Sequence, residues 1–253
     1  MSLTYTAYDV LRHLRAVSSM FFVAVLPSVL FILFGVAQGW SEEPLPGGNV
    51  SASVMVTMAA YGAITATTGI AGSAAVERLQ GWGRQLALTP MGTAGYAATK
   101  VAVAMTTAVV PVVVVFAVGL FTNATMDGAW RWVLSAVLAV VLSSVFALYG
   151  LAAGLLFRSD AAVGAASGCL VILGFFGNVF MPLSGGLLEV ARFTPMYGIV
   201  GLVRYPVTEG SVASMDGTPQ TDSVWLLLAN TAVWAIVFGV AALLAARKAT
   251  ARR

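Results

Sequence analysis

Charge is the scarcest property of this sequence. Only 9% of its 253 residues are charged, whereas a soluble domain carries about 25% charged residues. Hydrophobic residues make up 59% of the chain, and its 26 glycines are spread out rather than gathered in one low-complexity tract. The composition therefore argues against a soluble globule and favours a bundle of helices in a lipid bilayer.

Cysteine, histidine and lysine are almost absent. A single cysteine, Cys169, excludes an intrachain disulfide and a cysteine zinc site, and we expect it to be a small core residue. A single histidine, His13, excludes a serine-histidine intramembrane protease and a histidine-ligated metal centre, and we expect it on a solvated surface. With two lysines and no basic cluster outside the ends of the chain, nucleic acid is not an expected partner.

Long apolar runs are what the sequence has in abundance. A helix rises about 1.5 Å per residue, so crossing about 30 Å of hydrocarbon takes roughly 20 apolar residues. Six runs of this kind, none with an acidic or basic residue, cover residues 20–38, 50–76, 101–121, 132–157, 161–182 and 223–246. The sequence predicts an all-α, polytopic membrane protein with six transmembrane helices.

The charges between these runs predict the orientation of the chain. The side of the N-terminus has ten basic and three acidic residues, and the opposite side has three basic and seven acidic residues. Because lysine and arginine in short loops stay on the cytoplasmic side, both termini are expected in the cytoplasm. The run 20–38 is interpreted as a retained span, not a signal peptide, since no small-x-small cleavage pattern follows it.

Residues 1–19 show helical periodicity ahead of the first span. Leu3, Ala7, Val10, Leu11 and Leu14 recur at helical spacing, whereas the polar residues Asp9, Arg12, His13 and Arg15 fall on other faces. This pattern predicts an amphipathic helix in the cytoplasmic interface, followed by a six-helix transmembrane domain over residues 20–253. The alternative is an unstructured N-terminal extension.

The spans offer only neutral polar and aromatic side chains for function. Carboxylates or bases within spans would indicate an ion-coupled transporter or a proton relay, and they are missing here. We assign a substrate path to Thr57, Thr65, Phe175, Phe176 and Asn178.

Small residues four apart predict where helices pack closely. The pairs with this spacing are Gly35/Gly39, Gly150/Gly154 and Gly164/Gly168. Pro27 and Pro111 lie within spans and are expected to bend them.

The segment 77–90, between the second and third spans, carries the strongest pattern. If it is helical, Leu79, Trp82 and Leu86 share one face, and Thr89-Pro90 ends the helix. From the residues alone, the segment is either a short helix that docks on a partner or a turn that lies on lipid headgroups.

A family resemblance bears on this segment. It resembles the E-R-x-x-G-x-x-x-x-L-x-x-T-P signature of type-2 ABC exporter permeases, with Lys100 at about the usual distance before the third span. In that family the loop is the coupling helix that docks on a separate ATPase subunit. The resemblance therefore implies ATPase-coupling roles for Glu77, Arg78, Leu79, Gly81, Trp82, Arg84, Leu86, Thr89 and Pro90.

A second stretch, after the fifth span, is similar to the same family. An apolar run ends at Pro182, and an external helical segment follows over residues 183–206. Thr194 as N-cap and Pro195 at the first helical position predict a helix to about Arg204, which Pro206 stops. Gly185-Gly186 stands where the family commonly has a proline.

The resemblance implies the permease subunit of an ATP-driven ABC exporter in a bacterial cytoplasmic membrane. The chain lacks G-x-x-x-x-G-K-[ST], so no cofactor and no metal are expected on it, and the ATP and Mg²⁺ would be bound by the partner ATPase. The permease itself is not expected to be an enzyme. It would pair with a second copy or a similar permease.

The uncharged spans suit a small amphipathic or apolar substrate, such as a drug, an antibiotic or a lipid, better than a strongly charged one. Three other functions stay open. They are a secondary transporter or channel, an intramembrane transferase, and a membrane anchor or sensor without transport. An ATPase encoded by a neighbouring gene would discriminate among them.

Overall fold

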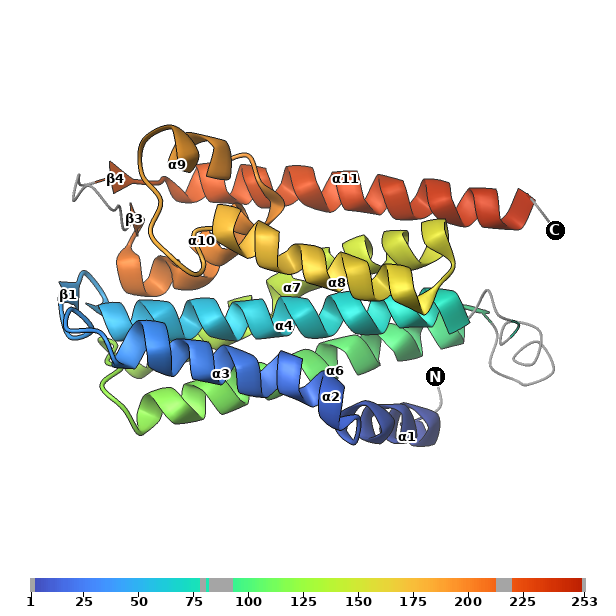
Figure 1. Cartoon of the computed structure of the whole chain (residues 1–253), viewed down its shortest axis with the longest axis horizontal. Coiled ribbons are helices and arrows are strands. Elements are labelled where there is room, and N and C mark those ends of the chain that lie inside the picture. Colours follow the sequence, from blue (N-terminus) through green and yellow to red (C-terminus); the bar gives the residue numbers. More distant parts are fainter. Residues whose placement is uncertain (1–2, 78–80, 82–92, 213–219, 252–253) are drawn as a thin grey trace.

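The computed structural model describes residues 3–77, 81, 93–212 and 220–251, which are mostly helical. Six helices run along the long axis of the molecule (Figure 1): α3 (Leu26–Phe31), α4 (Val50–Glu77), α6 (Thr93–Leu120), α7 (Ala129–Phe157), α8 (Asp160–Phe176) and α11 (Val224–Ala251). The predicted all-α class is confirmed.

Shorter elements complete the chain. Before α3 lie α1 (Leu3–Leu14), α2 (Val17–Met20) and the π-helical turn η1 (Phe21–Val25), and a second π-helical turn, η2 (Ile32–Val36), follows α3. Helices α9 (Gly185–Ala191) and α10 (Pro195–Thr208) lie at the end of the bundle that also has two short antiparallel hairpins (Figure 1). The hairpins pair β1 (Pro44–Leu45) with β2 (Gly48–Asn49), and β3 (Ser211–Val212) with β4 (Gln220–Thr221).

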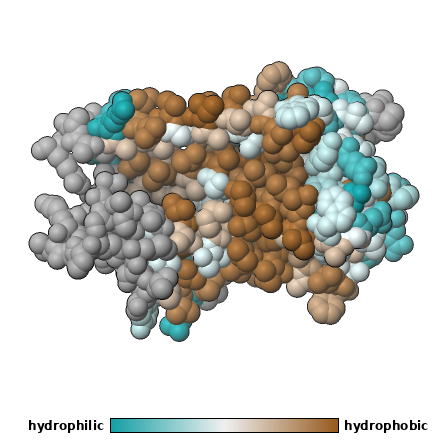
Figure 2. Space-filling view, turned by 180° about the vertical axis from the view of Figure 1, so that it is seen from behind, coloured by the Kyte–Doolittle hydropathy of each residue, from teal (hydrophilic) through white to brown (hydrophobic). Residues whose placement is uncertain are grey.

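Four helices are long and apolar enough to cross a membrane. They are α4, residues Thr99–Leu120 of α6, α7, and residues Val224–Lys248 of α11. They coincide with the predicted runs 50–76, 101–121, 132–157 and 223–246. The pair α9 and α10, bent by 93° at its break, gives a fifth candidate. Figure 2 shows an apolar belt across the middle of the molecule and hydrophilic residues gathered at one end, as expected of a membrane-embedded protein.

The other two predicted runs form shorter helices. The first is helical over Phe21–Val36, where π-helical turns flank α3 and Pro27 lies in the first turn of α3. Helix α8 has 17 residues and ends at Phe176. It stops there because Gly177 caps it and Asn178 adopts a left-handed φ of 56°. At about 1.5 Å per residue, α8 rises about 25 Å, less than the roughly 30 Å of hydrocarbon.

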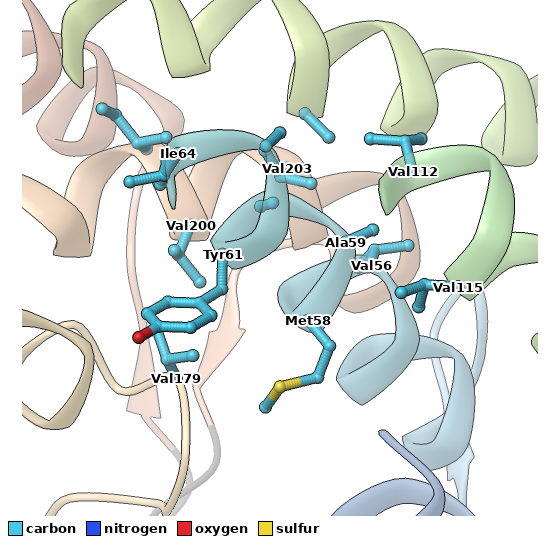
Figure 3. Packing of buried hydrophobic residues seen from close by; sticks show 14 of the residues in the cluster. Val56, Met58, Ala59, Tyr61, Ile64, Val112, Val115, Val179, Val200 and Val203 are labelled. Carbon is cyan, nitrogen blue, oxygen red and sulfur yellow. The ribbon is translucent and has the colours of Figure 1, made fainter. Parts of the chain in front are cut away.

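Helix α4 occupies the centre of the bundle. Its most apolar window is 78% buried, compared with 22% for α11 at the periphery. Figure 3 shows Met58 and Tyr61 of α4 among valines from neighbouring segments, including Val115 of α6 and Val200 of α10. Its many alanine, glycine, serine and threonine residues let neighbouring helices approach closely on every side, which suits a central place in a membrane bundle.

The backbones of α4 and α7 touch at one of the predicted glycine pairs. A Cβ on Gly150 would lie 2.1 Å from the Thr68 carbonyl oxygen, and one on Gly154 would lie 2.3 Å from that of Gly72. In addition, the Thr67 hydroxyl donates to the Ser143 carbonyl at 2.9 Å. Close packing at Gly150/Gly154 is therefore confirmed.

The glycine pair on α8 behaves differently. Cβ atoms on Gly164 and Gly168 would meet nothing within 4 Å, so this pair joins no helices of this chain. Cys169 next to it is exposed, and its expected place in the core was wrong. Residues 164, 168 and 169 lie on the outer side of α8, because Val163, Ala166 and Leu170 form the buried face.

Helix α10 begins as predicted but ends later. Thr194 precedes it and Pro195 lies in its first turn, although the Thr194 hydroxyl donates backward to the carbonyl groups of Phe176 and Ala191. The expectation that Pro206 stops the helix was wrong, because α10 continues through it to Thr208. Burial of Val203 and Val207 supports this last turn, and the Arg131 guanidinium donates to the Pro206 carbonyl.

Candidate functional sites at the two ends of the bundle

Two residues of the predicted coupling segment are described by the structure. Glu77 is the last residue of α4. Gly81 has a φ of 114°, a left-handed conformation in which only glycine is unstrained. The other predicted coupling residues, Arg78, Leu79, Trp82, Arg84, Leu86, Thr89 and Pro90, lie outside the described residues.

Glu77 belongs to a cluster of four charged side chains, here called the charged junction: Asp9, Arg12, Glu77 and Lys100. The Glu77 carboxylate lies 2.7 Å from the Arg12 guanidinium and 2.7 Å from the Lys100 ammonium. Lys100 also contacts Asp9 at 2.8 Å, and Arg12 contacts Asp9 at 3.0 Å. Two acids and two bases thus balance one another across α1, α4 and α6.

Three of the four side chains are largely removed from solvent. Asp9 and Lys100 are 5% and 7% exposed and Glu77 is 23% exposed, whereas Arg12, at 57%, covers the cluster from the solvent side. In such surroundings each charge needs its partners, because an uncompensated buried charge is costly. The junction therefore holds the last residue of α4 against α1 and the start of α6.

Helix α1 is consequently a packed element as well as an amphipathic one. Val10 packs against a cluster formed by Ile70, Val103 and Ala104. Asp9, which periodicity places off the apolar face, is nevertheless buried, because it pairs with Lys100, 91 positions away in the chain.

His13 is also less exposed than expected. Its side chain is only 17% exposed, and its Nδ1 lies 2.8 Å from the Asp9 carbonyl oxygen. The expected solvated position was therefore wrong, since the ring packs back along α1 toward the charged junction.

The opposite end of the bundle contains a cavity of about 340 Å³, here called the Arg204 pocket. Its lining comes from the region after α3, from the first turns of α4, from residues 178–182 and from α10. The lining residues are Phe34, Gln38, Trp40, Leu45, Val50, Ser53, Val54, Thr57, Asn178, Val179, Phe180, Met181, Pro182, Arg204, Thr208 and Ser211.

Two of the five predicted substrate-path residues, Thr57 and Asn178, line this pocket. Phe175 packs edge-on against the Phe180 ring, with centroids 5.2 Å apart. Thr65 lines a smaller cavity of about 130 Å³ together with His13. Phe176 lines neither cavity, and its carbonyl accepts a hydrogen bond from Thr194. The structure thus distributes the five residues instead of gathering them along one surface.

Arg204 is the one charged residue among those that line the pocket, and it was not predicted as a site residue. It is only 7% exposed, and its Nη1 donates to the Asn178 carbonyl at 3.3 Å. A signal was present in the sequence, because Arg204 is one of three basic residues on its side and follows an apolar stretch. It was interpreted as the end of a helix, and its burial depends on contacts that are distant in sequence.

A second arginine on this side is fully engaged. Arg192 contacts Asp222 at 2.9 Å and Glu189 at 2.6 Å, and the Tyr197 hydroxyl donates to the same Asp222 carboxylate. Burial alone lowers the pKa of Arg192, but the attraction of Asp222 and Glu189 outweighs it and raises that pKa. This network fastens the break between α9 and α10 to the residues before α11.

Among the residues that the structure describes, no group of three or more histidine, cysteine, aspartate or glutamate side chains could hold a metal ion. No protein-family model matches the chain, and no curated protein matches it either. The functional assignment must therefore rest on the sequence pattern of residues 77–90 and on the geometry of the two ends.

Proposed function

We propose that this chain is the transmembrane permease subunit of an ATP-driven exporter of the type-2 ABC family. It operates in a bacterial cytoplasmic membrane with six spans and both termini in the cytoplasm, as one half of a permease dimer. It moves a small amphipathic or apolar substrate out of the cell. A separate ATPase subunit supplies ATP hydrolysis.

One observation carries the proposal. Glu77, the first residue of the signature, is ion-paired to both Arg12 and Lys100. Segment 78–92 is therefore flanked by α4 on one side and α6 on the other, and α1 is fastened to both. A partner that moves this segment moves three elements together, which is what a coupling element requires.

The proposed mechanism follows from that connection. Closure of the ATPases displaces the coupling segment, the charged junction transmits the displacement to α1, α4 and α6, and the spans tilt. The tilt opens a cavity between the two permeases to the outside. The permease supplies no catalytic group, and Leu79, Trp82 and Leu86 supply the apolar docking face.

The test is co-purification with a P-loop ATPase encoded by a neighbouring gene. Replacing Trp82 by Ala removes a large aromatic side chain, and such an anchor commonly contributes about 2 kcal/mol or more at the centre of an interface. We expect at least a roughly 30-fold loss of ATPase affinity. Membrane insertion should be unaffected, because Trp82 lies outside every apolar run.

The matched control is Gln85→Ala, which alters a different face of the same segment and should leave binding nearly unchanged. Full ATPase association and full transport in Trp82→Ala would remove the coupling role. Robust ATP hydrolysis by the isolated permease would contradict the division of labour between the two subunits.

The orientation has its own test, in a Cys169→Ala background. Glu43 and Arg158 are both exposed. Glu43 directly precedes β1, and Arg158 lies between α7 and α8, whose connection is at the other end of the bundle from β1 (Figure 1). A membrane-impermeant thiol reagent should label Glu43→Cys on intact cells and Arg158→Cys only after permeabilisation. The reverse pattern would place segment 77–90 outside the cell, beyond reach of an ATPase.

A further inference from the structure

We propose that the Arg204 pocket binds an amphipathic anion, with a carboxylate or phosphate against Arg204 and an apolar body against the aromatic wall. This inference deepens the proposed function, and the relevance of the pocket to transport rests on that proposed function. The binding itself requires neither an ATPase nor transport, so the two can fail separately.

The charges around Arg204 are the first argument. No carboxylate among the described residues lies within ion-pair distance of its guanidinium, although Arg204 is 7% exposed. Asp222, which acts on it electrostatically, is already bound by Arg192 and by the Tyr197 hydroxyl. A buried cation without an acid is costly, and an anionic ligand would remove that cost.

Asn178 supplies a second donor group that lacks an acceptor. The side-chain Nδ2 of Asn178 is buried and has no hydrogen-bond partner, whereas its Oδ1 accepts from the Leu183 amide at 3.0 Å. Arg204 already donates to the carbonyl of this same residue. Two neighbouring donors on one pocket wall, one of them charged, recognise an acceptor with negative charge.

Apolar side chains in the pocket lining set the apolar part of the ligand. They include Phe34, Trp40, Val54, Phe180 and Met181. The volume of about 340 Å³ is at the lower end of small-molecule sites, which suits one chain or one ring system beside a single anionic group. The hydroxyls of Thr57 and Thr208 donate to carbonyls of their own helices, and being neutral they do not balance the charge of Arg204.

The experiment uses the full chain in nanodiscs of phosphatidylcholine. The probes are 1-naphthaleneacetate and its methyl ester, one fluorescent ring system with and without the negative charge. We expect the acid to bind wild type at least about 10-fold more tightly than the ester, because hydrogen bonds to charged groups are worth roughly a factor of ten or more. Equal affinity for the two probes would overturn the proposal.

The variants locate the site. Arg204→Gln should lose this preference for the acid, and Arg204→Lys should keep part of it. Arg158→Gln removes the same charge from the far end of the bundle and should bind the acid as wild type does. An Arg204→Gln protein that retains full preference for the acid refutes the assignment. If that variant does not fold, the probe pair on wild type and on Arg204→Lys still decides the outcome.

A competition arm identifies the source of the anion. The same titration is repeated in discs that contain phosphatidylglycerol, an anionic lipid. Weaker binding of the acid probe to wild type in these discs than in discs of phosphatidylcholine alone, with unchanged binding of the methyl ester, assigns the pocket to an anionic lipid headgroup. Unchanged probe affinity assigns it to a free amphipathic carboxylate or phosphate. Both results support an anionic site.

Discussion

The two ends of the bundle solve the problem of buried charge in opposite ways. In the charged junction, Asp9, Arg12, Glu77 and Lys100 balance one another at distances of 2.7 to 3.0 Å. At the other end, Arg204 is as deeply buried as Asp9 and Lys100, and among the described residues its guanidinium donates only to the Asn178 carbonyl, at 3.3 Å. Within the described part of the chain the first arrangement is balanced in charge and the second is not.

The difference separates a structural use of charge from a binding use. A neutral, closed cluster holds its elements together and gains little from an added ion. A cation that lacks an acid within the described residues costs stability until a ligand supplies the missing charge, and binding sites commonly carry such strain. Charge balance, more than charge count, therefore distinguishes the two ends.

The largest effect is expected at the charged junction. Lys100→Met leaves Asp9 and Glu77 with one base fewer, and breaking a buried pair typically costs about 3–5 kcal/mol. The thermal unfolding midpoint in detergent should fall accordingly. Lys248→Met, on the exposed end of α11, is the control and should change little. A double variant, Asp9→Asn with Lys100→Met, should recover part of the loss because it removes one charge of each sign.

A smaller effect is expected where α4, which reaches both ends, packs against α7. Gly150→Ala places a Cβ against the Thr68 carbonyl, and overpacking of this kind costs about 1–3 kcal/mol. Gly164→Ala, where the new Cβ meets nothing, should be neutral or slightly stabilising. The two variants are compared by thermal unfolding. Equal unfolding midpoints would mean that α4 and α7 can move apart at little cost to accept the added Cβ of Gly150→Ala.

The smallest effect is expected at the ion pair of Arg131 and Glu209. Arg131 lies 2.7 Å from Glu209, whose side chain is 51% exposed. An exposed pair contributes at most about 1 kcal/mol, so Glu209→Gln should shift the unfolding midpoint only slightly. Arg131 keeps its bonds to the carbonyls of Pro206 and Asp127 in this variant. A large shift would mean that Arg131 and Glu209 belong to a second closed network at this end, beside that of Arg192 and Asp222.

The parts of the fold that depend on local composition were predictable. The limits of α4 and α7 fall within about three residues of the apolar runs, because burial in lipid is a property of the run itself. The break at Gly177 and Asn178 was not, since it depends on two backbone conformations and not on hydropathy. Pro206 was misjudged for a related reason, because packing of Val203 and Val207 outweighs the local preference.

The candidate sites were less accessible to sequence reasoning. Nothing local indicates that Asp9 meets Lys100 or that Arg204 meets Asn178, since these partners are separated by 91 and 26 positions. Periodicity does assign Asp9 to a polar face of α1. It cannot tell whether that face meets solvent or a neighbouring lysine. The same limit applies to Cys169, which belongs to an apolar run but lies on the outer side of α8.

The central position of α4 makes one helix a lever between the two ends. Thr57 lines the Arg204 pocket and Glu77 ends the same helix in the charged junction, 20 positions and about 30 Å along the axis. A rigid tilt of about 5° around the middle of this length displaces its two ends by about 1.3 Å in opposite directions. A ligand that prefers one tilt must then change the affinity of whatever binds beside Glu77, and by thermodynamic reciprocity that partner changes the affinity for the ligand by the same factor.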